Sequence, residues 1–125
     1  MNRLAMLCCV PMIGCGGSAV GDWEGECAYT VGGDLSAYEV EIEVVDVKKG
    51  DINGTARVID DQQRLSNGTL DGQQDKKDLT LKVKFIDGAR EGDVFELIGE
   101  LDGRQIFGDF SLGSHTGDCE LERQE

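Results

Sequence analysis

Five cysteines and one histidine are the side chains of this 125-residue sequence best suited to nucleophilic or metal chemistry. The cysteines are spread along the chain: Cys8, Cys9, Cys15, Cys27 and Cys119. His115 lies in Gly113-Ser114-His115-Thr116-Gly117, which has the composition of a turn, and we interpret it as a surface histidine. Two cysteines and one histidine at this spacing do not match a zinc site.

Sequence motifs of the common enzyme classes are missing. The chain contains no phosphate-binding loop, no H-E-x-x-H and no EF-hand loop. Among 25 Asp and Glu residues some pair will always lie at the separation used by glycosidases, so such pairs indicate nothing without a cleft. We therefore expect a protein that is not an enzyme and has no cofactor.

The N-terminal segment has the order of a secretory signal, with Arg3 before an apolar run over residues 4–13. The run is about half the roughly 20 residues that a transmembrane helix needs. Its end, Met12-Ile13-Gly14-Cys15, resembles a bacterial lipobox, in which the cysteine is lipidated and becomes the mature N-terminus. An ordinary signal peptide cut within residues 16–19 is the alternative.

The lipobox resemblance implies a compartment and a domain division. Residues 1–14 would be a signal peptide, residues 15–21 a lipidated N-terminus with a short tether, and residues 22–125 one folded domain. A tether over residues 16–20 would let the domain stand about 20 Å from the membrane. By resemblance to enterobacterial sorting, Gly16 after Cys15 favours the outer membrane of the bacterial cell envelope.

Under the same interpretation only Cys27 and Cys119 remain, because Cys8 and Cys9 leave with the signal and Cys15 carries lipid. Extracytoplasmic compartments are oxidising, and one even pair of cysteines there indicates a disulfide. We therefore predict a Cys27–Cys119 bridge.

The sequence is strongly acidic, with a formal net charge of −13 that becomes −14 when Arg3 is removed with the signal. Nucleic-acid binding depends on neutralising phosphates with Lys and Arg, so this charge argues against it. The same charge disfavours adhesion to anionic lipid headgroups.

The mature sequence alternates apolar and polar residues with the two-residue period of β-strands, from Trp23 onwards. Eight strands are predicted, over residues 22–29, 38–47, 52–60, 65–72, 79–85, 93–101, 105–112 and 117–123. A change of phase after Val44 predicts a β-bulge. Asn53-Gly54 and Asn67-Gly68 could each form a hairpin turn, but we favour mid-strand positions because other turns lie close by.

Eight strands joined by short turns cannot form parallel pairs, which need long crossovers. The sequence predicts an all-β fold, an eight-stranded antiparallel up-and-down meander closed into a small barrel. A two-sheet β-sandwich is the alternative. The inward residues expected to fill most of the barrel are bulky: Trp23, Tyr29, Tyr38, Ile42, Phe85 and Phe110.

The polar face of the first, second and last strands is acidic. Closure would place nine carboxylates on one outer wall: Asp22, Glu24, Glu26, Glu39, Glu41, Glu43, Asp118, Glu120 and Glu122. Such a wall would improve solubility. A sharper hypothesis is that it binds a basic protein partner or Ca²⁺, a cation that prefers carboxylate oxygens.

Gly21-Asp22-Trp23 at the head of the first strand, with Arg123 at the end of the last, resembles the signature of the calycin superfamily of lipocalins and avidin-like barrels. The resemblance implies that Arg123 packs across Trp23 and that the barrel binds a small apolar ligand. The acidic exterior instead favours a membrane-anchored lipoprotein with a structural or protein-interaction role. We favour the second function, because bulky side chains would leave little room inside.

Overall fold

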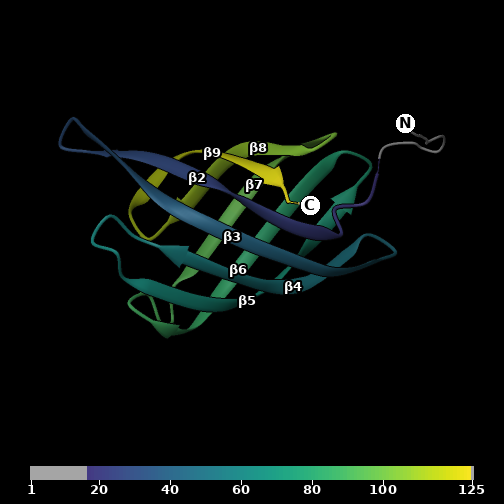
Figure 1. Ribbon diagram of the computed structural model, residues 1–125, viewed down its shortest axis with the longest axis horizontal. Coiled ribbons are helices and arrows are strands. Elements are labelled where there is room, and N and C mark those ends of the chain that lie inside the picture. Colours follow the sequence, from purple (N-terminus) through teal and green to yellow (C-terminus); the bar gives the residue numbers. More distant parts are fainter. Residues whose placement is uncertain (1–16, 125) are drawn as a thin grey trace.

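The computed structural model describes residues 17–124, which form a closed antiparallel β-barrel (Figure 1). The strands follow one another in chain order: β2 (Gly21–Val31), β3 (Asp34–Lys48), β4 (Asp51–Ile59), β5 (Leu65–Asp75), β6 (Asp78–Gly88), β7 (Val94–Asp102), β8 (Gln105–Leu112) and β9 (His115–Arg123). Each strand pairs with the next, and β9 pairs with β2. The predicted eight-stranded meander is confirmed, and the sandwich alternative is excluded.

The strand register contains two irregularities. Val44 pairs with Gly54 and Asp46 with Asn53, so Val45 is left as the extra residue of a β-bulge, as the phase change after Val44 predicted. A second shift lies between Asn67 and Gly68 in the β5–β6 pair. Both Asn-Gly pairs lie within strands, which confirms the mid-strand interpretation.

Apolar side chains fill the barrel interior. The six residues expected to point inward are all buried, and Trp23, Tyr38 and Phe85 are among the largest fully buried side chains. Where Gly99 pairs with Gly108, a Cβ on Gly99 would lie only 2.9 Å from the Gly108 Cα. Glycine therefore allows β7 and β8 to approach more closely than other residues would.

The barrel has two distinct ends. The N-terminal end is formed by residues 17–20, by the turns that follow β3, β5 and β7, and by the end of β9. The distal end is formed by the turns that follow β2, β4, β6 and β8. Within residues 17–124 there is no helix of a length and apolarity that could cross a membrane.

Residues 17–20 lie on the barrel, which corrects the expectation of a free tether there. Ala19 is fully buried, and its carbonyl accepts a 2.9 Å hydrogen bond from the Trp23 indole. The Gln74 amide binds this segment twice, at Ala19 N (3.1 Å) and at the Gly17 carbonyl (3.0 Å). The signal segment, Cys15 and Gly16 lie outside the described residues.

Candidate functional site

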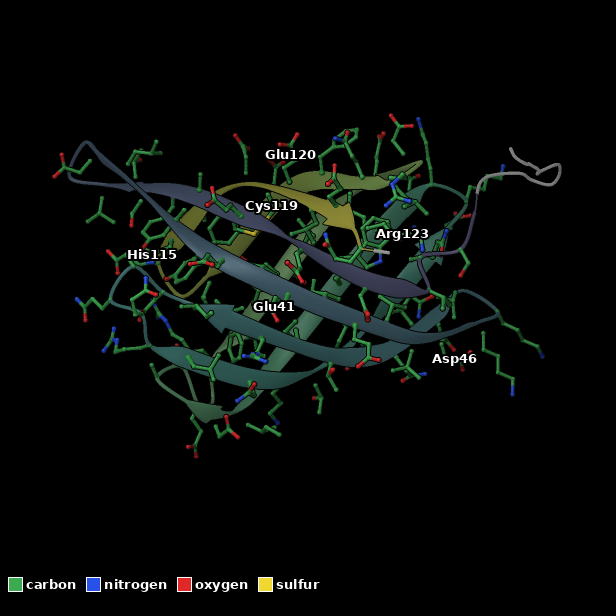
Figure 2. The ribbon with its side chains drawn as sticks, in the orientation of Figure 1. Glu41, Asp46, His115, Cys119, Glu120 and Arg123 are labelled. Carbon is green, nitrogen blue, oxygen red and sulfur yellow. A yellow bond between two sulfur atoms is a disulfide. The ribbon has the colours of Figure 1, made fainter. Side chains whose placement is uncertain are left out.

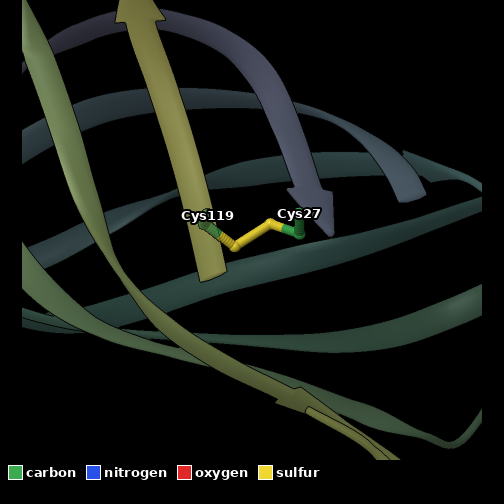
Figure 3. Close-up of a disulfide and its surroundings, with 2 residues drawn as sticks. All are labelled: Cys27 and Cys119. Carbon is green, nitrogen blue, oxygen red and sulfur yellow. A yellow bond between two sulfur atoms is a disulfide. The ribbon is translucent and has the colours of Figure 1, made fainter. Parts of the chain in front are cut away.

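The disulfide joins the first and last strands inside the barrel (Figure 3). Cys27 on β2 pairs directly with Cys119 on β9, and both side chains are buried. The bridge confirms the predicted pairing and spans a sequence separation of 92. A cross-link over so long a loop restricts the unfolded chain strongly, so it is worth roughly 4 to 5 kcal/mol in the chain-entropy model.

Arg123 lies across Trp23 at the N-terminal end, with its guanidinium carbon 4.4 Å from the ring centroid. The guanidinium also donates hydrogen bonds to the carbonyls of Ser18 (3.0 Å) and Val20. Burial lowers the pKa of Arg123 from its ordinary value, and the neighbouring Arg104 lowers it further. The pair therefore closes the barrel end through packing and hydrogen bonds to the chain before β2.

Strands β9, β2 and β3 are adjacent, so the nine predicted carboxylates form one exposed surface, which we call the acidic wall. Figure 2 labels Glu41 and Glu120, which lie on its two outer strands. The register opposes carboxylates directly in five places: Asp22–Glu43, Glu24–Glu41, Glu26–Glu39, Glu24–Glu122 and Glu26–Glu120. Like charges directly opposed across strands destabilise a sheet.

The edges of the acidic wall differ in charge. On the β4 side, Arg57 lies 4.0 Å from Glu41, an exposed ion pair that contributes little. On the β8 side, Asp109 pairs with Asp118 and extends the wall by a carboxylate that was missing from the predicted set. Its signal was present in the alternation of β8, where Asp109 precedes the inward Phe110.

An open hollow of about 540 Å³ lies on the outer surface where β8, β9 and β2 meet. Phe107, 39% exposed, and Ala28 provide its apolar surface. Its polar rim is acidic and comprises Glu26, Asp109, Asp118 and Glu120. This Phe107 hollow thus combines apolar surface with negative charge.

The acidic wall gives no support to a calcium site. Among the described residues, no group of three or more His, Cys, Asp or Glu side chains is arranged to hold a metal ion. The carboxylates face outward in rows and do not converge on a common point.

His115 is not a simple surface histidine, which corrects the interpretation of its turn-like segment. It is the first residue of β9, is half-buried, and stacks on Tyr29 with ring centroids 4.2 Å apart. Its Nδ1 lies 2.6 Å from the Tyr38 hydroxyl, which also accepts a 2.6 Å hydrogen bond from Arg90. Burial raises the pKa of Tyr38 to about 12. The Tyr38 hydroxyl thus joins His115 to Arg90, and we assign the cluster to closing the distal end.

Comparison with known proteins supports the fold. The sequence matches no family of known proteins, and no curated protein is significantly similar to it. Among solved structures, a de novo designed fluorescence-activating β-barrel is similar, with a TM-score of 0.67 and 14% sequence identity. The match covers 84% of this chain and 93% of the designed one. At this identity the similarity shows a shared barrel fold and nothing about shared chemistry.

Proposed function

We propose that this protein is a lipid-anchored, non-catalytic domain of the bacterial cell envelope that binds a basic segment of another protein on its acidic wall. The observation that carries the proposal is the register, which opposes carboxylates in five places across three adjacent strands. The lipobox-like ending at Cys15 supports the anchor.

Charge repulsion within the wall favours a binding role over solubility alone. Each directly opposed like-charge pair costs up to about 1 kcal/mol. Solubility needs only net charge, which carboxylates spread over the other walls would supply without this cost. A basic partner would relieve the repulsion, so binding and stability would increase together.

The Phe107 hollow gives the wall a place for a long basic side chain. Its apolar surface can cover the aliphatic stem of a lysine or arginine, and the carboxylates at its rim can pair with the charged head. The exposed Phe107 ring can also contact a guanidinium through a cation–π interaction. These features favour a peptide rich in arginine over a small inorganic cation.

A small apolar ligand inside the barrel is the second candidate function. The similar designed barrel is described as fluorescence-activating, and an eight-stranded barrel has room for one small ligand at most. In this chain the interior carries bulky buried side chains, with Tyr29 and Tyr38 stacked at 4.8 Å and Phe95 and Phe110 at 5.7 Å. Mass spectrometry of extracts from natively purified protein tests this candidate, and a stoichiometric apolar compound would favour it.

The wall is tested by titrating the protein with an octa-arginine peptide in a calorimeter. The variant Glu24→Gln/Glu26→Gln removes the two carboxylates at the centre of the wall, each opposed on both sides. We expect its Kd to rise about tenfold, which is about 1.4 kcal/mol. Phe107→Ala should raise the Kd by a smaller factor.

The matched control is Asp61→Asn/Glu91→Gln, which removes the same charge from exposed positions in distal turns. We expect the control to change the Kd less than twofold at 150 mM salt, because surface charges more than about 8 Å away are screened. Equal weakening by both variants would show only a general attraction between net charges, and the proposed site would be rejected.

The anchor is tested separately with Cys15→Ala. If Cys15 is lipidated, the variant should stay unprocessed and should not incorporate a labelled acyl chain. Unchanged processing would show that cleavage occurs elsewhere and that the anchor is absent.

A further inference from the structure

The lysines of the folded domain are concentrated at one end of the barrel. Lys48, Lys49, Lys76 and Lys77 lie in the turns after β3 and β5, and all four are exposed. The remaining two, Lys82 and Lys84, are exposed on the side wall in β6. Because strand direction alternates, turns 27 residues apart in sequence lie at the same, N-terminal end.

The turns of the N-terminal end are joined into one continuous surface by backbone hydrogen bonds. Gln74 N donates to the Gly50 carbonyl (2.7 Å), Leu101 N to the Lys77 carbonyl (2.7 Å), and Arg123 N to the Arg104 carbonyl (2.8 Å). These bonds link the turn after β3 to the turn after β5, then to the turn after β7, and finally to β9. The turns that carry the lysines are therefore connected by hydrogen bonds into one surface.

The two ends of the barrel differ in charge. The three turns of the N-terminal end, residues 48–51, 75–78 and 102–105, hold five bases and four acids. The four distal turns, residues 31–34, 59–65, 88–94 and 112–115, hold two bases and five acids. The net charge of the whole sequence does not reveal this difference between the two ends.

The chain before β2 leaves from the same N-terminal end. Residues 17–20 are fastened to the barrel by Gln74, Trp23 and Arg123. Gly17 is two residues after Cys15, a chain length of at most about 7 Å. If Cys15 carries the lipid, as the proposed function holds, this end cannot stand far from the membrane.

We propose that the N-terminal end of the barrel lies on the membrane surface, where the lysines at residues 48, 49, 76 and 77 contact anionic lipid headgroups. An anionic leaflet attracts lysines placed close to it. The four aspartates in the same turns have short side chains, whereas lysine stems carry their amines further out. The acidic wall begins at this end with Asp22 and its partner Glu43, whereas Glu26 lies five residues beyond Gly21, about 17 Å along the strand and beyond the Debye length of about 8 Å.

This orientation rests on the proposed anchor and extends it. The acidic wall then stands perpendicular to the membrane surface, and the distal end is furthest from the membrane. Figure 2 shows Arg123 and His115 towards opposite ends of the barrel, which marks this axis. A partner would then reach the wall from the side.

The experiment is amine acetylation of the purified full-length product, read at each lysine by mass spectrometry. The lipidated protein is compared in neutral detergent micelles, in phosphatidylcholine vesicles and in vesicles that also contain phosphatidylglycerol. On the anionic vesicles we expect labelling of Lys48, Lys49 and Lys76 to fall at least fivefold relative to micelles. Lys84 serves as the internal control and should change less than twofold, and Lys82, whose amine lies 3.8 Å from Glu96, serves as the control for the ion-paired Lys77. Lys77 is a weaker reporter, because its amine already lies 3.6 Å from Glu100.

Three results would overturn the proposal. They are equal labelling of all six lysines on anionic vesicles, protection that is the same on phosphatidylcholine vesicles, and protection that survives 0.5 M NaCl.

A second experiment removes the charge of the turn lysines. The variant combines Lys48→Gln, Lys49→Asn, Lys76→Asn and Lys77→Gln. Asparagine is chosen at 49 and 76 because these residues have φ of 54° and 59°, which asparagine tolerates. Vesicle flotation of the unacylated variant should be lost, whereas Lys82→Gln/Lys84→Gln should leave flotation unchanged.

Failure of the anchor is distinguished by the mass of the N-terminal peptide, which shows directly whether Cys15 is acylated. If it is not, the same labelling is done with protein added to anionic vesicles at low salt. Protection of the turn lysines there would still support the contact surface, and uniform labelling would overturn it.

Discussion

The two ends of the barrel are closed by different chemistry. At the N-terminal end, Trp23 is covered by Arg123 and by the backbone of residues 17–20. At the distal end, the stacked rings of Tyr29, Tyr38 and His115 meet Arg90, and the buried Asp60 organises the neighbouring turn. The N-terminal closure uses an indole, a guanidinium and backbone carbonyls, whereas the distal end contains Tyr38, whose pKa is raised to about 12, and Asp60, whose pKa is lowered. Changes in pH should therefore loosen the distal end first.

The protein contains natural probes for this difference. Its one tryptophan is at the N-terminal end, and both tyrosines are at the distal end. Tryptophan fluorescence and tyrosine absorbance consequently report on separate ends of the same barrel.

The largest expected effect comes from the disulfide that joins β2 to β9. Reduction, or Cys27→Ala/Cys119→Ala, should lower the free energy of unfolding by up to roughly 4 to 5 kcal/mol, because the unfolded chain regains the entropy of a long loop. The bridge lies two residue pairs from the distal limit of the β2–β9 ladder, so hydrogen exchange should accelerate there first. Urea unfolding with both probes gives the measurement, and an unchanged midpoint after complete reduction would contradict it.

Asp60 should give the next largest effect. Burial acts to raise its pKa, but hydrogen bonds from Arg64 and Gln62 outweigh burial, and the net pKa is lowered. Because the folded pKa is depressed, this stabilisation is present above the ordinary carboxyl pKa of about 4 and is lost as pH falls through the folded value. Asp60→Asn should cost about 2 to 3 kcal/mol at pH 7 and flatten the loss on acidification.

The control for Asp60 is Asp34→Asn, an exposed carboxylate in the neighbouring turn after β2. It should change the free energy of unfolding at pH 7 by less than about 0.5 kcal/mol. Similar acid profiles for the two variants would refute the role of Asp60.

Tyr38→Phe tests the hydroxyl that joins Arg90 to His115. Its removal should cost about 1 to 3 kcal/mol, because two polar partners lose a hydrogen bond in a half-buried site. The pKa of Tyr38 is raised to about 12. The unfolded chain ionises first, so stability is complete below the ordinary tyrosine pKa of about 10 and is lost as pH rises towards 12. The variant should lose less stability over that interval.

In the same alkaline titration, tryptophan emission should change only after tyrosine absorbance does. Simultaneous changes would contradict the expectation that the distal end loosens first.

Arg123→Met should have the smallest effect, about 1 kcal/mol, because a guanidinium over an indole at a partly exposed site contributes modestly. Methionine keeps an apolar stem over Trp23 but loses the bonds to the Ser18 and Val20 carbonyls. Tryptophan emission should shift to longer wavelength, while tyrosine absorbance stays constant. Arg123→Lys keeps the positive charge but lacks the planar guanidinium, so it should recover only part of the stability that Arg123→Met loses.

Much of the fold follows from local pattern. Alternation with period two defines a strand and both of its faces at once, so the inward Trp23 and the outward Glu24 could be predicted together. The bulge after Val44 was visible as a change of phase. The lipobox-like ending at Cys15 is equally local, and it stays a prediction because it lies outside the described residues.

The candidate site was predictable in part. The alternation identified which carboxylates face outward, and the Cys27–Cys119 pair indicated that β9 lies beside β2. The partners of each carboxylate were not predictable, because a slip of two residues would keep the same face outward and change every opposed pair. The hollow beside Phe107 and the added Asp109 depend on that register and on the close approach of β7 and β8 at Gly99 and Gly108.

The sequence by itself determined the strands, their two faces, the acidic composition of the outer wall and the paired cysteines, because each of these depends on residues close together in the chain or on composition. Only the tertiary structure decided where residues 17–20 lie, that His115 enters the aromatic cluster, and that four lysines share one end. Ala19 meets Gln74 across 55 residues and Tyr38 meets His115 across 77, and contacts at such separations are decided by barrel closure and register. Local alternation contains no information about either, since every register of the same parity satisfies it equally.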